Sequence, residues 1–169
     1  MYTVSLSVFE SFVREGVEAV PERFRSRITN VVFLVEEEPT PKQRHDHRLS
    51  SRETLFGLYE GVPRTVRGAD YGGLVLPDRI TIFKKSIEHE AASLEEVRAQ
   101  VIETVWHEVA HHFGLDETRV QRRESERKKL PTKAGHKEEK GGSQSRTSRF
   151  YIQPILSLGI PAFPLDRGP

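Results

Sequence analysis

The chain has 169 residues, no cysteine and a formal net charge of +1, from 26 Lys/Arg and 25 Asp/Glu. This length allows one domain with its own hydrophobic core. The lack of cysteine excludes disulfides and thiolate metal sites, so any metal must be held by His, Asp or Glu. There is no signal-peptide pattern and no apolar stretch near the roughly 18 residues of a membrane span. We therefore expect a soluble, cytoplasmic protein without a membrane partner.

Positive charge is concentrated near the C-terminus. From Lys128 onward the chain carries eight Lys/Arg and three Asp/Glu, and residues 131–148 contain almost nothing apolar. Such composition is typical of disorder. We predict one domain over residues 1–129, followed by a basic, low-complexity extension over residues 130–169. A basic tail can contact nucleic acid, but a solvated tail is the favoured interpretation.

Helical periodicity marks the beginning of the chain. Ser7 and Glu10 have the spacing of a capping box, and apolar residues at helical spacing follow them. We predict a helix over residues 8–20. Pro21 is typical of the first turn of a helix, so a second, short helix is expected over residues 22–28.

Three strands are expected in the middle of the chain. The β-branched run at residues 31–35 predicts a buried strand, and residues 54–59 predict a second one. Residues 79–84 alternate in polarity, which predicts a strand with one solvent-exposed face. The polar stretch 36–53 contains two prolines and is expected to be a loop.

A long helix is predicted over residues 94–113. It begins at a second capping-box pattern, Ser93 with Glu96, and its apolar residues cover a broad arc, which is typical of a largely buried helix. Gly114 fits the left-handed position that ends a helix. A charged surface helix is expected to follow over residues 116–129.

The sequence His107-Glu108-Val109-Ala110-His111 lies on this long helix. Residues four apart share one helix face, so both imidazoles can bind one zinc ion at about 2.0–2.1 Å. Glu108 can then act as the general base on a zinc-bound water, whose pKa the metal lowers from about 15.7 toward 7. This pattern predicts a hydrolase with a single catalytic zinc ion.

A catalytic zinc site needs a third protein ligand. Glu117 lies ten residues after the first histidine, the spacing at which this ligand is found when a glycine turn follows the motif. Asp116 is one residue early, but it has the shorter carboxylate and is also a candidate N-cap of the next helix. Both residues stay candidates, and His112 is expected to be a polar neighbour of the site.

Three segments stand out together: Phe-Gly-Leu-Tyr-Glu-Gly-Val-Pro at 56–63, Leu-Pro-Asp-Arg-Ile-Thr-Ile-Phe at 76–83, and the motif with its turn at 107–117. They resemble the bacterial zincin-like metallopeptidases, or mini-zincins, which are similar to the Asp-zincins. The resemblance covers residues 6–125. It implies an α+β zincin-like scaffold, in which a small mixed sheet packs on the active-site helix, with one zinc ion and peptidase activity. The sequence departs from the pattern at Glu117, where Asp is expected.

Zincins commonly place a strand edge beside the metal helix, and residues 79–84 or 54–59 could supply it. Tyr59 is the candidate phenol for stabilising an oxyanion, although a packing role is the simpler interpretation. Asp78 is expected to form a structural ion pair or to orient a ligating histidine. A second metal site at His45 and His47 is disfavoured, because nothing nearby completes it.

The favoured function is therefore a zinc-dependent metallopeptidase acting on peptides or flexible protein segments. One alternative is a metal-dependent endoribonuclease resembling the ribosomal-RNA endonucleases with three histidines, but these lack a residue equivalent to Glu108 and have His at the position of Glu117. The other is a non-catalytic regulatory protein stabilised by zinc.

Overall fold

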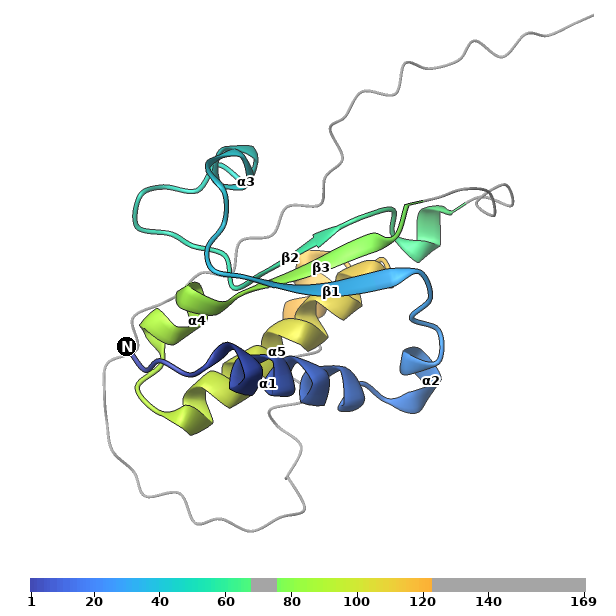
Figure 1. Ribbon diagram of the computed structural model, residues 1–169. Coiled ribbons are helices and arrows are strands. Elements are labelled where there is room, and N and C mark those ends of the chain that lie inside the picture. Colours follow the sequence, from blue (N-terminus) through green and yellow to red (C-terminus); the bar gives the residue numbers. More distant parts are fainter. Residues whose placement is uncertain (68–75, 123–169) are drawn as a thin grey trace, which may run out of the picture.

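The computed structural model describes residues 1–67 and 76–122 and has an α+β architecture, as expected (Figure 1). The elements in chain order are α1 (Leu6–Glu18), α2 (Glu22–Arg25), β1 (Val31–Glu36), α3 (Pro41–Asp46), β2 (Gly57–Glu60), the 3-10 helix η1 (Arg64–Val66), β3 (Asp78–Phe83), α4 (Lys84–Glu90) and α5 (Leu94–His112).

The described residues contain one three-stranded mixed sheet, ordered β1-β3-β2. β1 pairs parallel to β3, with Val31 opposite Asp78, and β2 pairs antiparallel to β3, with Gly57 opposite Ile82. β3 is thus central, which corrects the expectation that residues 79–84 could form a free edge with one wet face. All of its side chains except that of Arg79 are buried.

The expectation of a buried strand at residues 31–35 is also wrong. β1 is an edge strand, and Val32 and Leu34 on its outer face are 38% and 37% exposed. The alternate residues Val31, Phe33 and Val35 pack against the core. An unbroken apolar run cannot by itself distinguish a central strand from an edge strand.

α1 and α5 cover one face of the sheet and enclose the main core between helices and strands (Figure 1). The two helices approach closely at Gly16, where an added Cβ would lie 3.0 Å from Cβ of Val105. On the opposite face Leu55, Leu58 and Phe83 form a smaller cluster. The central strand is therefore covered on both faces, and α5 packs directly on β2 and β3.

Local signals place several boundaries differently from the expectation. The N-cap of α1 is Ser5, whose hydroxyl accepts from Val8 N at 3.4 Å, rather than Ser7. α3 interrupts the expected loop at 36–53, where Thr40 and Gln43 form a reciprocal capping box. α4, at residues 84–90, was not expected; it follows β3 directly.

The predicted start of the long helix is confirmed. Ser93 Oγ accepts from Glu96 N at 3.1 Å, while the Glu96 carboxylate accepts from Ala92 N at 2.8 Å instead of closing the box on Ser93. Of the helix expected over 116–129, the described part is helical at residues 117–122. The remainder of that helix and the extension at 130–169 lie outside the described residues.

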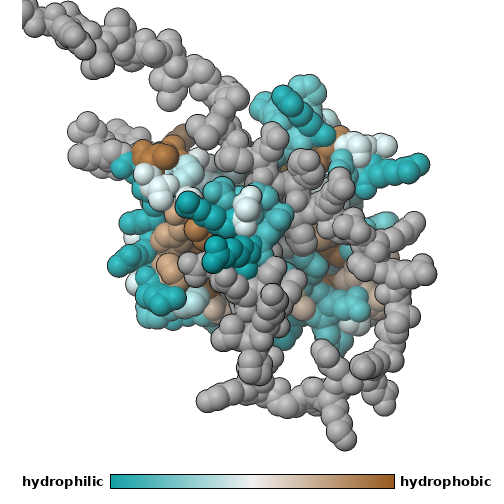
Figure 2. Space-filling view, turned by 180° about the vertical axis from the view of Figure 1, so that it is seen from behind, coloured by the Kyte–Doolittle hydropathy of each residue, from teal (hydrophilic) through white to brown (hydrophobic). Residues whose placement is uncertain are grey.

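Polar side chains dominate the visible described surface when the molecule is seen from behind, with smaller apolar areas between them (Figure 2). Within residues 1–67 and 76–122, no helix combines the length and apolarity needed to span a bilayer.

Candidate metal centre

The C-terminal end of α5 positions the site. Gly114 has φ +80°, and two hydrogen bonds close the turn: Gly114 N donates to His111 O at 2.8 Å and Leu115 N donates to Ala110 O at 3.1 Å. A left-handed residue of this kind reverses the chain at a helix end. The predicted role of Gly114 is confirmed, and the reversal returns the chain toward the helix face that carries the motif.

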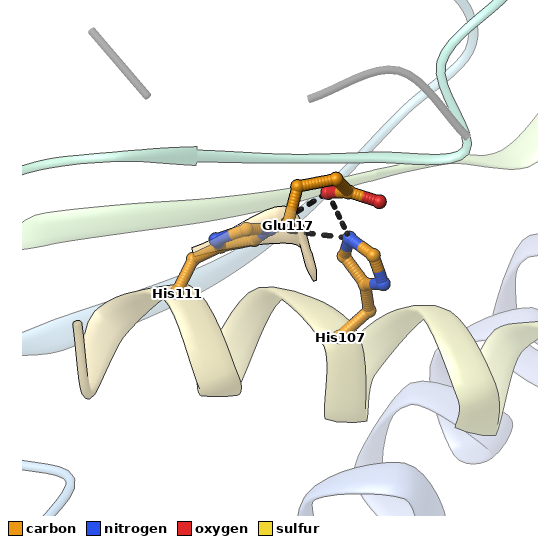
Figure 3. Close-up of side chains that lie close together, drawn as sticks. All are labelled: His107, His111 and Glu117. Atoms are coloured by element: carbon orange, nitrogen blue, oxygen red, sulfur yellow. Dashed lines mark hydrogen bonds and ion pairs between the residues drawn. The ribbon is translucent and has the colours of Figure 1, made fainter. Parts of the chain in front are cut away.

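His107, His111 and Glu117 converge on one point (Figure 3). The two histidines are on the same face of α5, one turn apart, and their Nε2 atoms are 3.1 Å apart. Oε2 of Glu117 lies 3.3 Å from Nε2 of His107 and 3.5 Å from Nε2 of His111. Both imidazoles are buried, whereas the carboxylate is partly exposed.

A backbone carbonyl fixes the tautomer of His111. Its Nδ1 lies 2.9 Å from Leu115 O, and because a carbonyl oxygen can only accept, Nδ1 carries the proton. In the neutral ring Nε2 then presents a lone pair to the cluster. A metal-ligating histidine commonly has this arrangement, with its second ring nitrogen hydrogen-bonded to a carbonyl or carboxylate.

The geometry fits a zinc ion. Three ligand atoms held about 2.0–2.2 Å from one ion in tetrahedral directions lie about 3.3–3.6 Å from one another. The separations of 3.1, 3.3 and 3.5 Å among the three atoms are close to this spacing. Oε2 of Glu117 is buried, and apart from its ion-pair contacts with the two imidazoles it has no hydrogen-bond partner among the described residues, which leaves it available to a cation.

The two histidines determine the charge state of Glu117. Burial would raise the pKa of Glu117, but when Nε2 of His107 and of His111 is protonated in the metal-free chain, hydrogen bonds from the two rings outweigh burial and lower the pKa to about 2. The carboxylate is therefore ionised at neutral pH and available as a metal ligand.

Glu108 is the most deeply desolvated acid of the site. Its residue is 1% exposed, and burial raises the pKa of its carboxyl to about 7, although the neighbouring His107 and His111 oppose this shift. The backbone of Tyr59 in β2 donates a hydrogen bond to it. Oε2 has no hydrogen-bond partner among the described residues, so one carboxylate oxygen is free to handle a proton.

Gly57 provides the space for this carboxyl group. An added Cβ at Gly57 would lie 2.6 Å from Oε1 of Glu108 and 2.7 Å from Cγ2 of Thr104. No role was predicted for this residue. The signal was present, because a glycine inside a strand often marks the close approach of another group.

The structure separates the two candidate carboxylates. Asp116 is not part of the cluster and acts as an N-cap: its Oδ1 accepts from Arg119 N at 2.9 Å, and its side chain is 58% exposed. Glu117 is the first helical residue after this cap. The turn thus brings Glu117, at the spacing favoured by the sequence, to the two imidazoles.

The phenol of Tyr59, the candidate group for stabilising an oxyanion, is hydrogen-bonded to a buried carboxylate. Its hydroxyl donates to Oδ2 of Asp78 at 2.8 Å. Asp78 also accepts from Nδ1 of His112 at 3.0 Å and from the guanidinium of Arg67. Asp78 therefore orients the histidine next to the cluster, His112, instead of one of the two that converge on Glu117.

The other sequence candidates lie apart. His45 is exposed beside Asp46, and among the described residues the His/His/Glu cluster is the one group arranged to hold a metal. The hydrogen bond from His111 to the Leu115 carbonyl was not foreseen, because it depends on the path of the turn.

Comparisons with known proteins bear on the same part of the chain. A family model described as a zincin-like metallopeptidase matches residues 28–127. Among solved structures, a conserved hypothetical protein of Thermus thermophilus is 25% identical, with a TM-score of 0.45, over 65% of this chain and 94% of that chain. No curated protein matches the chain. The range matched by the family model contains the whole sheet, α5 and Glu117.

Proposed function

Because the chain belongs to the zincin-like metallopeptidase family, we propose that it is a zinc-dependent peptidase whose metal is held by His107, His111 and Glu117. The observation that carries the proposal is the triangle of their ligand atoms, with sides of 3.1, 3.3 and 3.5 Å. A catalytic zinc site takes three protein ligands and leaves a position open for water or substrate.

Zinc supplies Lewis-acid chemistry, which makes water acidic near neutral pH and polarises a carbonyl group. Glu108 is the proposed general base. Its free Oε2 takes a proton from the attacking water and then delivers it to the leaving amine. A carboxyl pKa raised by burial to about 7 supports this role, because a base works best with a pKa near the operating pH.

The free edge of β2 is the proposed binding surface for a peptide. Phe83 N donates to Phe56 O at 2.8 Å, so Phe56 faces β3 and the alternate residues Gly57 and Tyr59 direct their backbone groups outward. The Tyr59 amide already donates to Glu108, so the outward carbonyl groups and the Gly57 amide are what the edge offers a peptide. Gly57 also contacts Glu108. An extended peptide that pairs with this edge would therefore pass beside the proposed base. This arrangement favours flexible peptide segments as substrates.

Metal analysis combined with a peptide-library digest tests the proposal. We expect one zinc ion per wild-type chain and cleavage that a chelator abolishes. Glu108→Gln should retain zinc and lose activity by roughly 10²–10⁴-fold, the usual contribution of a general acid–base group. Glu95→Gln is the matched control, because this glutamate is on the same helix but exposed, and it should cleave like wild type.

Two results would contradict the proposal. A purified wild-type chain that binds no zinc at stoichiometric concentration would remove the metal centre. A Glu108→Gln variant that cleaves as fast as Glu95→Gln would remove the base. A single-stranded RNA substrate in the same assay should stay intact, which separates the peptidase from the endoribonuclease alternative.

A further inference from the structure

Asp78 is a buried carboxylate that joins the elements around the metal centre. It is 2% exposed and begins β3. Oδ2 accepts from Tyr59 in β2 at 2.8 Å, from His112 in α5 at 3.0 Å and from the guanidinium of Arg67. A buried carboxylate needs several donors to offset its desolvation, and here they come from three different parts of the chain.

One path leads from Asp78 to the histidine that we propose as a ligand. His112 is fully buried, and its Nδ1 is the atom that contacts Asp78. This residue is in the last turn of α5, directly after His111. The hydrogen bond therefore fixes the rotation of the helix end about its axis, and with it the direction of the neighbouring imidazole.

A second path leads to Glu117 through the segment 61–67. Val62 N lies 3.4 Å from Oδ1 of Asp78, and Gly61 lies so close that an added Cβ would overlap the carboxyl group. At the other end of this segment, Thr65 packs against Gly114, where an added Cβ would overlap its side chain. The segment thus supports the turn that delivers Glu117 to the two imidazoles.

We propose that Asp78 is a positioning residue for the metal centre, which aligns His111 and Glu117 through His112 and the segment 61–67. This inference rests on the proposed zinc site. The hydrogen-bond partners of Asp78 are Tyr59, Val62, Arg67 and His112, so it acts on the proposed ligands through its neighbours. Outer residues that orient metal ligands typically contribute 10–100-fold to metal affinity.

The test compares metal binding by full-length wild type and Asp78→Asn. Asn has nearly the same size, but its uncharged amide satisfies the three donors poorly. Zinc affinity is measured by competition with a chromogenic chelator, and the visible spectrum of the Co²⁺-substituted protein reports ligand geometry. We expect zinc binding to weaken by about 10–100-fold and the Co²⁺ spectrum to change.

Glu88→Gln is the matched control for a loss of stability alone. Glu88 is as buried as Asp78, at 1% exposed, and forms an ion pair with Lys84 at 2.7 Å in α4, on an element that carries none of the proposed ligands. Its replacement should lower the melting temperature of the fold. We expect zinc affinity and the Co²⁺ spectrum to stay as in wild type.

A second pair of variants keeps the test decisive if Asp78→Asn does not fold. His112→Asn retains a donor for Asp78, whereas His112→Leu removes it. We expect the Asn variant to keep most of the zinc affinity and the Leu variant to lose at least about tenfold.

The inference is overturned if Asp78→Asn matches wild type in zinc affinity and Co²⁺ spectrum. It is also overturned if Glu88→Gln weakens zinc binding as much as Asp78→Asn does, or if the two His112 variants behave alike. A wild-type chain that binds neither metal would instead overturn the proposed function, and the inference with it.

Discussion

Replacing Glu108 by Gln should stabilise the metal-free protein at alkaline pH even though it removes the proposed base. In the folded chain burial raises the pKa of this carboxyl from 4.5 to about 7. Between these two values the folded state holds a proton that the unfolded state has lost, so stability falls as the pH rises. Above pH 7 the folded chain contains an ionised, buried carboxylate, which an uncharged amide avoids.

The size of the effect follows from the two pKa values. A difference between about 7 and 4.5, at roughly 1.36 kcal/mol per pKa unit, gives about 3 kcal/mol. Glu108 is 1% exposed, so solvent screening reduces this figure little. At pH 5, where the folded state keeps its proton, the same relation gives a destabilisation of less than about 1 kcal/mol.

Urea denaturation at pH 5 and pH 8, with a chelator present, measures the effect. The free energy of unfolding of Glu108→Gln minus that of wild type should be more positive at pH 8 than at pH 5 by roughly 2–3 kcal/mol. Comparing the two pH values cancels the cost of packing an amide in place of a carboxyl group. Glu95→Gln, which changes an exposed residue of the same helix, should show little pH-dependent gain.

If the stability difference between Glu108→Gln and wild type does not depend on pH, this reasoning is refuted. Such a result would mean that the Glu108 carboxyl ionises as readily in the folded chain as in the unfolded one. The site would then lack the desolvated base that the proposed mechanism requires.

Three further outcomes test the site. Glu117→Gln should weaken zinc binding at least tenfold, as measured by chelator competition. Asp116→Asn alters only a helix cap, so it should leave zinc binding unchanged and lower the stability seen in thermal melting by at most about 1 kcal/mol. Gly57→Ala should lower the free energy of unfolding by about 1–3 kcal/mol and impair hydrolysis more than zinc binding, since the new methyl group meets Glu108 at 2.6 Å. A kcat equal to that of wild type would argue against this close contact. Gly114→Ala should destabilise the fold by more than about 1 kcal/mol, because φ is +80° there and alanine is strained in that conformation. A melting temperature equal to that of wild type would show that this strain is absent.

Local signals predicted the long helix well. The cap at Ser93, the broad apolar arc and the terminating Gly114 are all short-range features, and each was found where expected. The cap of α1 was misplaced by two residues, because Ser5 and Ser7 both offer a hydroxyl and the sequence does not choose between them. The helix at Pro41–Asp46 was missed even though Thr40 and Gln43 carry a capping-box pattern.

The sheet was less predictable. Its strands were located, but their order was not, since β1 and β3 are far apart in sequence and pair through long-range contacts. This error affected the expected binding edge, for which 79–84 was considered as well as 54–59. The observed strand order makes 79–84 central and leaves 54–59, which overlaps β2, as the edge segment beside α5.

The sequence by itself determined the chemistry that is available: two imidazoles at helical spacing on one face, and a carboxylate between them. These are properties of one helix, so no partner segment was needed to foresee them. Only the tertiary structure decided the rest. Through the direction of a turn it placed Glu117 rather than Asp116 beside the two imidazoles. It also opened room for Glu108 at Gly57 and directed the Tyr59 hydroxyl to Asp78. Each of these depends on the path of a segment outside the helix, which periodicity and spacing do not encode.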